Sequence, residues 1–217
     1  MFAEQEMCHW KRGLYAPLLI ALFLGLIILA LITYHRESSR DILLKEAIQR
    51  VQDEKSVVAV ELLGSINDKR AIPELVKLLK NKESINLYCA AMDGLVKLNA
   101  KESATEIVDL LNDKNWWLCE KASETLVKLD AKEVIPELIE LLSVEYHTTL
   151  WLSNDMYYAD IDSRYLHGLV AITLIELNAK DKVPEENIRD IEYLASTPII
   201  SCAIRAKTVL TRINSGR

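Results

Sequence analysis

The 217-residue chain contains only six glycines and five prolines, which argues against collagen-like chains, flexible linkers and turn-rich all-β folds. Four cysteines are too few for the disulfide framework of a small secreted domain. A net charge of −6 disfavours a protein that grips nucleic-acid phosphates, because such domains are usually basic. The sequence also lacks a phosphate-binding glycine loop, a nucleophile elbow, a zinc-protease motif and paired C-x-x-C ligands. We therefore expect no catalysis, no cofactor and no metal.

One long hydrophobic run lies near the N-terminus. No residue between Arg12 and His35 carries a formal charge, and 18 of the 21 residues from 14 to 34 are hydrophobic. As a helix, this segment would rise about 31 Å, which is enough to cross a typical hydrocarbon core. The run therefore predicts a transmembrane helix over residues 14–34, preceded by an N-terminal tail of residues 1–13.

Two alternatives to a membrane anchor are a buried core helix and a cleaved signal peptide. A core helix is rarely so long and so uniformly apolar. A signal peptide would end in small residues, whereas this run ends in Leu31-Ile32-Thr33-Tyr34. Three basic residues closely follow the run and two closely precede it, which favours a repeat domain facing the cytoplasm.

Beyond residue 37 the chain repeats itself. Tetrads of the form [Ile/Leu]-[Asn/Asp]-x-Lys begin at Ile66, Leu98, Leu129 and Leu177, and a fifth copy starts at Ile213. Apolar residues at helical spacing flank each tetrad, and a small residue, usually alanine, recurs seven positions before it. The Asn or Asp tolerates the left-handed conformation and so ends a helix. Each repeat is therefore predicted to be a helix pair with a tight turn, and the pairs stack into an all-α, right-handed α-solenoid.

The repeats resemble the HEAT-like repeat family, in particular the short repeats also found in phycocyanobilin lyases. The resemblance rests on the pattern A-x-x-x-L-x-x-L-[ND]-x-K followed by [AV]-[IV]-P-E-L-[IV]-x-L-L, which is clearest at residues 91–111 and 122–142. It covers about 53–214 and implies a solenoid of about four HEAT-like helix pairs. Such repeats serve scaffolds, adaptors and a few enzymes alike, so the resemblance implies a fold more than a function.

Departures from the regular repeat define the remaining segments. Residues 37–52 have an amphipathic pattern and predict a helix that caps the solenoid and joins it to the membrane helix. The spacing before the fourth tetrad is too long, which predicts an insertion at about 144–162 within the repeat domain of residues 53–214. In the fourth copy the apolar residues after Pro184 are shifted, so the second helix of that copy should start late.

The second helices of a solenoid normally line one of its faces, and here their equivalent positions are mostly acidic. These positions hold Glu74, Glu106 and Glu137 in the first turn, with Lys77, Asp109 and Glu140 one turn further on. Such a row could receive a basic partner by electrostatic complementarity. The alternative is that a first-turn glutamate only stabilises its own helix through the helix dipole. Residues 37–217 carry a net charge of −7, which disfavours nucleic acid and anionic lipid as ligands.

Two groups of aromatic residues are further candidates for partner contact. Trp116 and Trp117 follow Asn115, a predicted N-cap, and adjacent helical residues point in different directions, so both cannot be buried in the core. One tryptophan is then a contact anchor, unless both pack at a repeat junction. The insertion is predicted to be either a recognition loop or an extended helix with a packed loop, and its aromatic candidates are Trp151, Tyr157 and Tyr158.

The leading hypothesis is a single-pass, membrane-anchored scaffold or adaptor that binds a partner protein on its solenoid without catalysis. The partner would be basic, and neither nucleic acid nor a small-molecule substrate is expected. The alternative, implied by the family resemblance, is an enzyme or enzyme subunit of the bilin-lyase type. That alternative predicts a chromophore-sized cleft with a nucleophile or an acid beside it.

Overall fold

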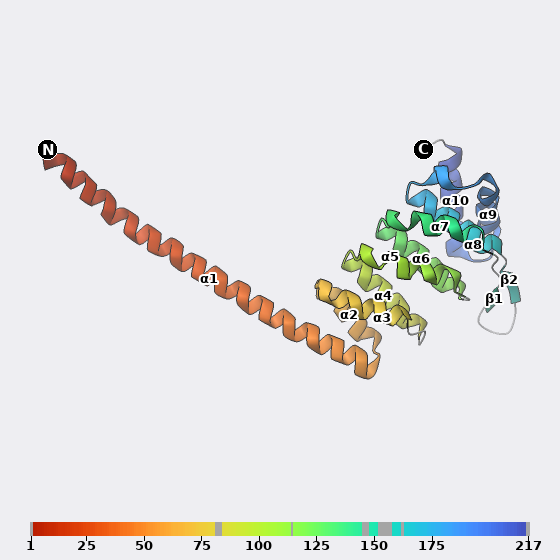
Figure 1. The fold of residues 1–217 in the computed structure, drawn as a ribbon, viewed down its shortest axis with the longest axis horizontal. Coiled ribbons are helices and arrows are strands. Elements are labelled where there is room, and N and C mark those ends of the chain that lie inside the picture. The colour runs from red at the N-terminus through yellow and green to blue at the C-terminus, as the bar shows by residue number, and fades with distance from the viewer. Residues whose placement is uncertain are drawn as a thin grey trace. The chain divides into compact units, whose positions relative to one another are not determined.

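The computed structural model describes residues 2–80, 84–113, 115–144, 148–151, 158–161 and 163–215, with side chains from residue 21 onward outside the two strands. It divides into two compact units, Met1–Glu46 and Ala47–Arg217 (Figure 1). The first unit consists of helix α1 (Phe2–Glu54), whose last residues belong to the second unit. The segments predicted as a membrane helix and a connecting helix run on as this one uninterrupted helix.

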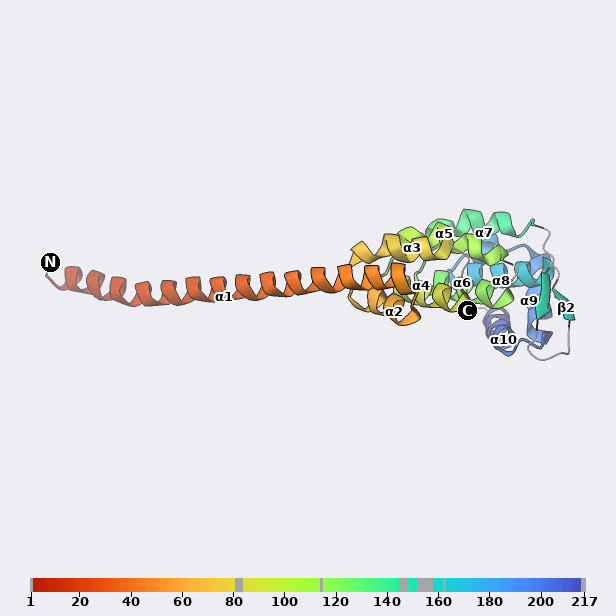
Figure 2. The same cartoon turned by 90° about the horizontal axis from the view of Figure 1, so that it is seen from below.

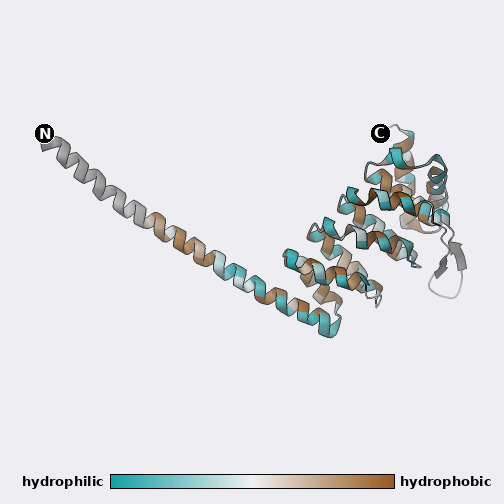
Figure 3. Ribbon diagram, in the orientation of Figure 1, coloured by the Kyte–Doolittle hydropathy of each residue, from teal (hydrophilic) through white to brown (hydrophobic). Residues whose placement is uncertain are grey.

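The described side chains in the apolar part of α1 are exposed. Every side chain from Ala21 to Tyr34 is exposed, including Phe23 at 67% and Leu31 at 61%, and Figure 3 shows this stretch in brown. Residues Ala21–Glu54 form a helix long and apolar enough to cross a membrane, and none of its most apolar window is buried. A helix in a protein core would hide such a surface, so α1 is a candidate membrane span.

The second unit consists of stacked helix pairs. The first helices of the pairs are α2 (Val57–Ser65), α4 (Ile85–Lys97), α6 (Trp116–Lys128) and α8 (Ser163–Glu176). The second helices are α3 (Ile72–Lys80), α5 (Ala104–Val108) with its continuation η3 (Asp109–Asn112), α7 (Ile135–Leu141) and α9 (Glu185–Ser196). Short 3-10 turns lead into them: η1 (Lys69–Ala71), η2 (Lys101–Ser103), η4 (Lys132–Val134) and η5 (Lys180–Lys182). Figure 2 shows α3, α5 and α7 in one layer and α4, α6 and α8 in another, which confirms the predicted α-solenoid.

The tetrads form the turns within the pairs, as predicted. Their second residues all have positive φ: Asn67 at 55°, Asn99 at 50°, Asp130 at 50° and Asn178 at 64°. In the last three tetrads, the N–H of the following alanine donates to the carbonyl five residues earlier, at 2.8–3.1 Å. This is the Schellman arrangement, which satisfies carbonyls that the end of a helix would leave without a partner. Asn and Asp are therefore selected here by backbone conformation.

Small residues bring the first helices close together. The recurrent alanines, such as Ala91 and Ala122, are fully buried. A close approach occurs between α2 and α4, where a Cβ added to Gly64 would lie 2.5 Å from the Cα of Gly94. The two backbones therefore touch without side chains between them, which is possible only with glycine at Gly64.

The fourth pair departs from the regular repeat. Helix α7 begins six residues after the start of its tetrad, whereas α9 begins eight residues after the start of its own, so the predicted late start is confirmed. The insertion contains two antiparallel strands, β1 (Thr148–Trp151) and β2 (Tyr158–Ile161), with Thr148 opposite Ile161. In the described residues, this hairpin is the one departure from the predicted all-α fold.

Helix α10 (Ile200–Asn214) packs against α8 and α9 and reaches α6. Ser201 Oγ donates to Glu120 Oε2 at 2.8 Å, and Arg205 Nε donates to Glu176 Oε2 at 2.9 Å. These contacts place α10 on the side of the first helices that faces away from α3, α5 and α7 (Figure 2). Its two sides therefore differ, one being buried on the first helices and the other open.

Candidate partner-binding surfaces

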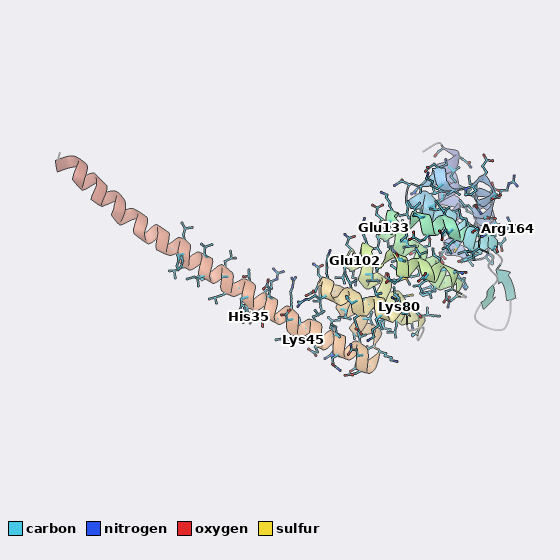
Figure 4. The ribbon with its side chains drawn as sticks, viewed as in Figure 1. His35, Lys45, Lys80, Glu102, Glu133 and Arg164 are labelled. Carbon is cyan, nitrogen blue, oxygen red and sulfur yellow. The ribbon has the colours of Figure 1, made fainter. Side chains whose placement is uncertain are left out.

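Repeats two and three carry three acidic residues each at matching positions of their second helices. The spacing is i, i+4 and i+7, which puts all three side chains on one side of a helix. We call these six residues the acidic face: Glu102, Glu106, Asp109, Glu133, Glu137 and Glu140. Figure 4 shows Glu102 and Glu133 at the same edge of the solenoid, on the turns that lead into α5 and α7.

The matching positions of the first repeat are neutralised. They hold Arg70, Glu74 and Lys77 instead of three acids. Lys77 Nζ lies 3.6 Å from Glu74 Oε1, which also accepts a hydrogen bond from Gln52 Nε2 at 3.4 Å. Arg70 pairs with Asp68 at 2.6 Å. Glu74 is therefore engaged by Lys77 and by Gln52 of α1, and its side chain is only 16% exposed, whereas four of the six acids in the next two repeats are exposed.

Most of the acidic face lacks a neutralising cation. Lys80 Nζ lies 3.5 Å from Glu106 Oε1, whereas Oε2 of Glu137 is buried without a hydrogen-bond donor in the described residues. Four acids are exposed, and across the described ranges no Lys, Arg or His nitrogen lies within 4.0 Å of them: Glu102, Asp109, Glu133 and Glu140. Four like charges on two neighbouring helices repel one another and attract cationic ligands.

The helix dipole explains only part of this row. Glu106 and Glu137 lie in first turns, where a negative charge is stabilised. Asp109 lies at the junction of α5 and its continuation η3, as the residue after α5 and the first residue of η3. Glu140 lies in the last turn of α7, where no basic residue is present and a negative charge is unfavourable. The helix dipole therefore does not explain the acid at Glu140.

Glu102 and Glu133 are functional candidates that the helical pattern after each tetrad does not single out. Each follows the lysine of its tetrad by one position and sits on a 3-10 turn. That turn extends the register of the second helix backwards by one turn, so each acid joins the same row. The repeated Lys-Glu pair after the tetrad is the sequence signal that could have found them.

The paired tryptophans lie on the other layer. Asn115 Oδ1 accepts hydrogen bonds from the backbone N–H of Trp117 at 3.0 Å and Leu118 at 3.3 Å, so the predicted N-cap is confirmed. Trp117 is 43% exposed, while Trp116 is half-buried and its carbonyl accepts from Tyr165 Oη at 3.3 Å. Because α6 is a first helix, Trp117 and the acidic face belong to two separate surfaces.

The aromatic candidates of the insertion are only partly placed. Tyr157 lies outside the described residues, whereas Trp151 and Tyr158 pair across the hairpin, with their side chains outside the described part of the structure. The base of the insertion is fixed, because His167 Nε2 lies 2.9 Å from the carbonyl oxygen of Val144. A carbonyl can only accept, so the imidazole donates from Nε2.

The thiols of the repeat domain are poor nucleophiles. Burial raises the pKa of Cys202 to about 12, and Oη of Tyr165 lies 3.3 Å from its Sγ. Burial also raises the pKa of Cys89, and Cys119 is buried. Over the described residues, no group of three His, Cys, Asp or Glu side chains could hold a metal ion.

A hollow of about 390 Å³ lies on α1. It is lined by side chains of that helix alone: Ile28, Leu31, Ile32, His35 and Arg36. One helix cannot enclose a ligand, so this hollow is a crease and not the chromophore-sized cleft that a bilin-lyase reaction would require.

The stacked helix pairs and the left-handed turns within them define a helical-repeat protein of the α-solenoid class. Residues 72–149 match the family model of HEAT repeats, and residues 57–81 match that of the PBS lyase HEAT-like repeat. No curated protein matched the sequence. Over residues 57–149 these matches support the HEAT-like repeats that the resemblance implied. A shared repeat establishes the fold and assigns no reaction.

Proposed function

We propose that this protein is a membrane-anchored scaffold whose HEAT-like solenoid binds a basic segment of a partner protein on the acidic face. The observation that carries the proposal is the group of four exposed acids that have no cationic nitrogen within 4.0 Å in the described residues, one of which, Glu140, lies at a helix end where the helix dipole disfavours it. HEAT repeats build extended surfaces of this kind, because successive helices present equivalent positions side by side.

The anchor would be α1, whose exposed apolar stretch suits lipid better than water. The basic residues that follow this stretch favour a solenoid in the cytoplasm. An anchor of this kind holds the acidic face near the bilayer and raises its effective concentration for partners on the same membrane.

The charge of the acidic face alone would steer a basic partner towards it more than it would give a high affinity for that partner. An exposed ion pair contributes about 0.2–1 kcal/mol, so four pairs supply roughly 1–4 kcal/mol before ordering costs. The exposed Ile139, at 37%, precedes Glu140 on α7 and points about 100° away from it, so it offers an apolar contact at the border of the acidic face. Binding should weaken as salt rises, because the Debye length falls from about 10 Å at 0.1 M to 3 Å at 1 M.

Photo-crosslinking in native membranes tests the proposal. A photoreactive amino acid replaces Ile139 at the border of the acidic face, or Val58, which is 72% exposed on α2, as the control position. We expect crosslinked protein products from position 139 that fade in high salt, and few from position 58. The double reversal Asp109→Lys/Glu140→Lys should remove them, because it turns attraction for a basic segment into repulsion.

A matched control uses the same change of charge elsewhere. Glu61 on α2 and Glu192 on α9 are exposed acids outside the acidic face. The variant Glu61→Lys/Glu192→Lys should retain the products from position 139. Equal loss in both double variants would show that net charge matters and the acidic face does not. Products that survive Asp109→Lys/Glu140→Lys would overturn the proposal.

A further inference from the structure

Charge is segregated along the chain. Residues 37–199 hold 19 basic and 30 acidic side chains, a net charge of −11, whereas residues 200–217 hold four basic and no acidic ones. Every other α-helix from α2 onward contains at least one acidic residue, and α10 contains none. The solenoid is therefore acidic up to its last described helix, which is basic.

The open side of α10 combines apolar and cationic groups. Ile200 is 75% exposed and Ile204 is 61% exposed, and Lys207 follows at a spacing that keeps it on the same side. Arg205 is turned to the buried side, where it pairs with Glu176. In the portions of the chain that the structure covers, neither Lys207 nor Arg212 has a carboxylate within 4.0 Å. Arg212 is exposed about 140° around the helix from Lys207, so the two cations flank the isoleucines on either side. We call Ile200, Ile204, Lys207 and Arg212 together the basic face.

We propose that the basic face of one copy docks on the acidic face of a second copy of this chain. The inference rests on the proposed function and names the basic segment that the acidic face receives. Each face supplies what the other lacks. Unpaired cations meet unpaired acids, and Ile200 and Ile204 meet the exposed Ile139.

The geometry favours contact between copies over contact within one copy. Within the solenoid, α10 lies on the opposite side of the first helices from α5 and α7, so its basic face does not reach the acidic face of its own chain (Figure 2). Pairing of two basic faces would bring Lys207 and Arg212 against their own copies, which like charges oppose. The contact is therefore heterologous, and repetition of it gives rings or rows of molecules.

Anionic lipid is the competing occupant of the basic face. Two isoleucines and two cations would suit a headgroup region, with each cation contributing about 1 kcal/mol. The net charge of −11 on residues 37–199 opposes an anionic surface, whereas it favours a second basic face. The second copy is therefore the occupant that the charges favour.

The test uses the purified full chain in phosphatidylcholine vesicles, with the photoreactive residue at position 139 and two tags of different size on separate preparations. We expect crosslinked dimers in low salt. Lys207→Glu/Arg212→Glu should lower the dimer yield about tenfold, the effect of two surface ion pairs of ordinary strength, and Asp109→Lys/Glu140→Lys should do the same. Mixing the two variants should restore dimers that carry both tags, because each variant then presents a face complementary to the other. Thermal unfolding of both variants should match that of the unaltered chain, because all four residues are exposed.

The outcomes separate this inference from the proposed function. Dimers that persist in each variant alone, or a mixture that restores none, would overturn the inference. If position 139 captures other proteins in native membranes while the purified chain gives no dimer, the proposed function stands and the second copy is not the partner. If neither experiment gives a product, both fail. A photoreactive residue at position 204 that labels lipid in vesicles containing phosphatidylserine, in place of protein, would assign the basic face to the membrane and would also overturn the inference.

Discussion

The substitution Gly64→Ala tests the close packing of α2 against α4 at Gly64 and Gly94. An added Cβ at Gly64 would meet the Cα of Gly94 at 2.5 Å and its N and C atoms at 3.5 Å. Ordinary contacts of a Cβ begin at about 3.4 Å, so α2 and α4 would have to separate locally by roughly 1 Å. All three neighbouring atoms belong to backbone, so no side chain can rotate away. The packing of α2 on α4 must loosen instead.

Two opposing terms decide the sign of the effect. Alanine is a better helix former than glycine by about 1 kcal/mol, which favours the variant. Overpacking of a well-packed site typically costs about 1–3 kcal/mol, and here it acts on backbone atoms, which puts it toward the upper part of that range. The expected net result is a loss of about 1–2 kcal/mol.

Thermal unfolding of the full chain in detergent, followed by circular dichroism, measures the loss. For a chain of this size, 1 kcal/mol shifts Tm by roughly 2–4 °C, so Tm should fall by about 2–8 °C. Gly94→Ala should have a smaller effect, because its Cβ meets the flexible end of Leu75 at 3.0 Å and the Cα of Gly64 at 3.4 Å. Gly25→Ala should be neutral, because nothing lies within 4 Å of its Cβ. A Tm for Gly64→Ala equal to or above that of the unaltered chain would refute the close approach of α2 and α4.

Four further predictions concern individual residues. Asn99→Val should destabilise the solenoid by about 1–2 kcal/mol in the same assay, because a β-branched residue is strained at φ 50°, while Asn99→Gly should be nearly neutral. Maleimide at pH 8 should modify Cys89 faster than Cys202, because Cys202 is buried and its pKa is raised to about 12. Mass spectrometry of the native protein measures both rates, and equal rates would disprove the prediction. Because the pKa of Cys202 is raised above its ordinary value of about 9, its contribution to the free energy of unfolding is complete below pH 9 and is lost as the pH rises towards 12. The stability of the Cys202→Ala variant should therefore decline less steeply over this pH range than that of the unaltered chain. Trp117→Ala should leave crosslinking from Ile139 unchanged, since the two side chains lie on different layers; a loss of products would merge the two surfaces.

The fold could be predicted from the sequence because its repeating unit is marked by residues with a backbone role. The Asn or Asp of each tetrad is needed for a positive φ, so its recurrence reveals the helix ends before any packing is known. The contact of Gly64 with Gly94 could not be read in this way, because the two glycines do not occupy equivalent positions in their repeats. The β-hairpin lies in the insertion, where repetition offers no guide.

The candidate site was only partly readable, because one residue type serves two purposes. A glutamate in a first helical turn stabilises its helix whether or not a partner exists, so Glu106 and Glu137 alone could not distinguish the two readings. The position of a helix end determines which acids lie where the helix dipole opposes a negative charge. Helix ends are difficult to place from a sequence, because they differ by one or two residues even between assignments made from a structure. Glu74 shows the converse, because its partners Gln52 and Lys77 become visible only in three dimensions.

The net charge of the whole repeat domain does not reveal the basic face. A net charge of −7 over residues 37–217 describes an acidic domain that would repel its own copies. The same charges, divided at residue 199, describe a body of −11 and a basic end of four cations, of which Lys207 and Arg212 have no carboxylate within 4.0 Å in the described residues. Like molecules repel when their charge is spread evenly, but they attract in one orientation when it is divided between separate faces. The acidic composition therefore sets which orientation two copies can adopt, with α10 of one copy against α5 and α7 of the next.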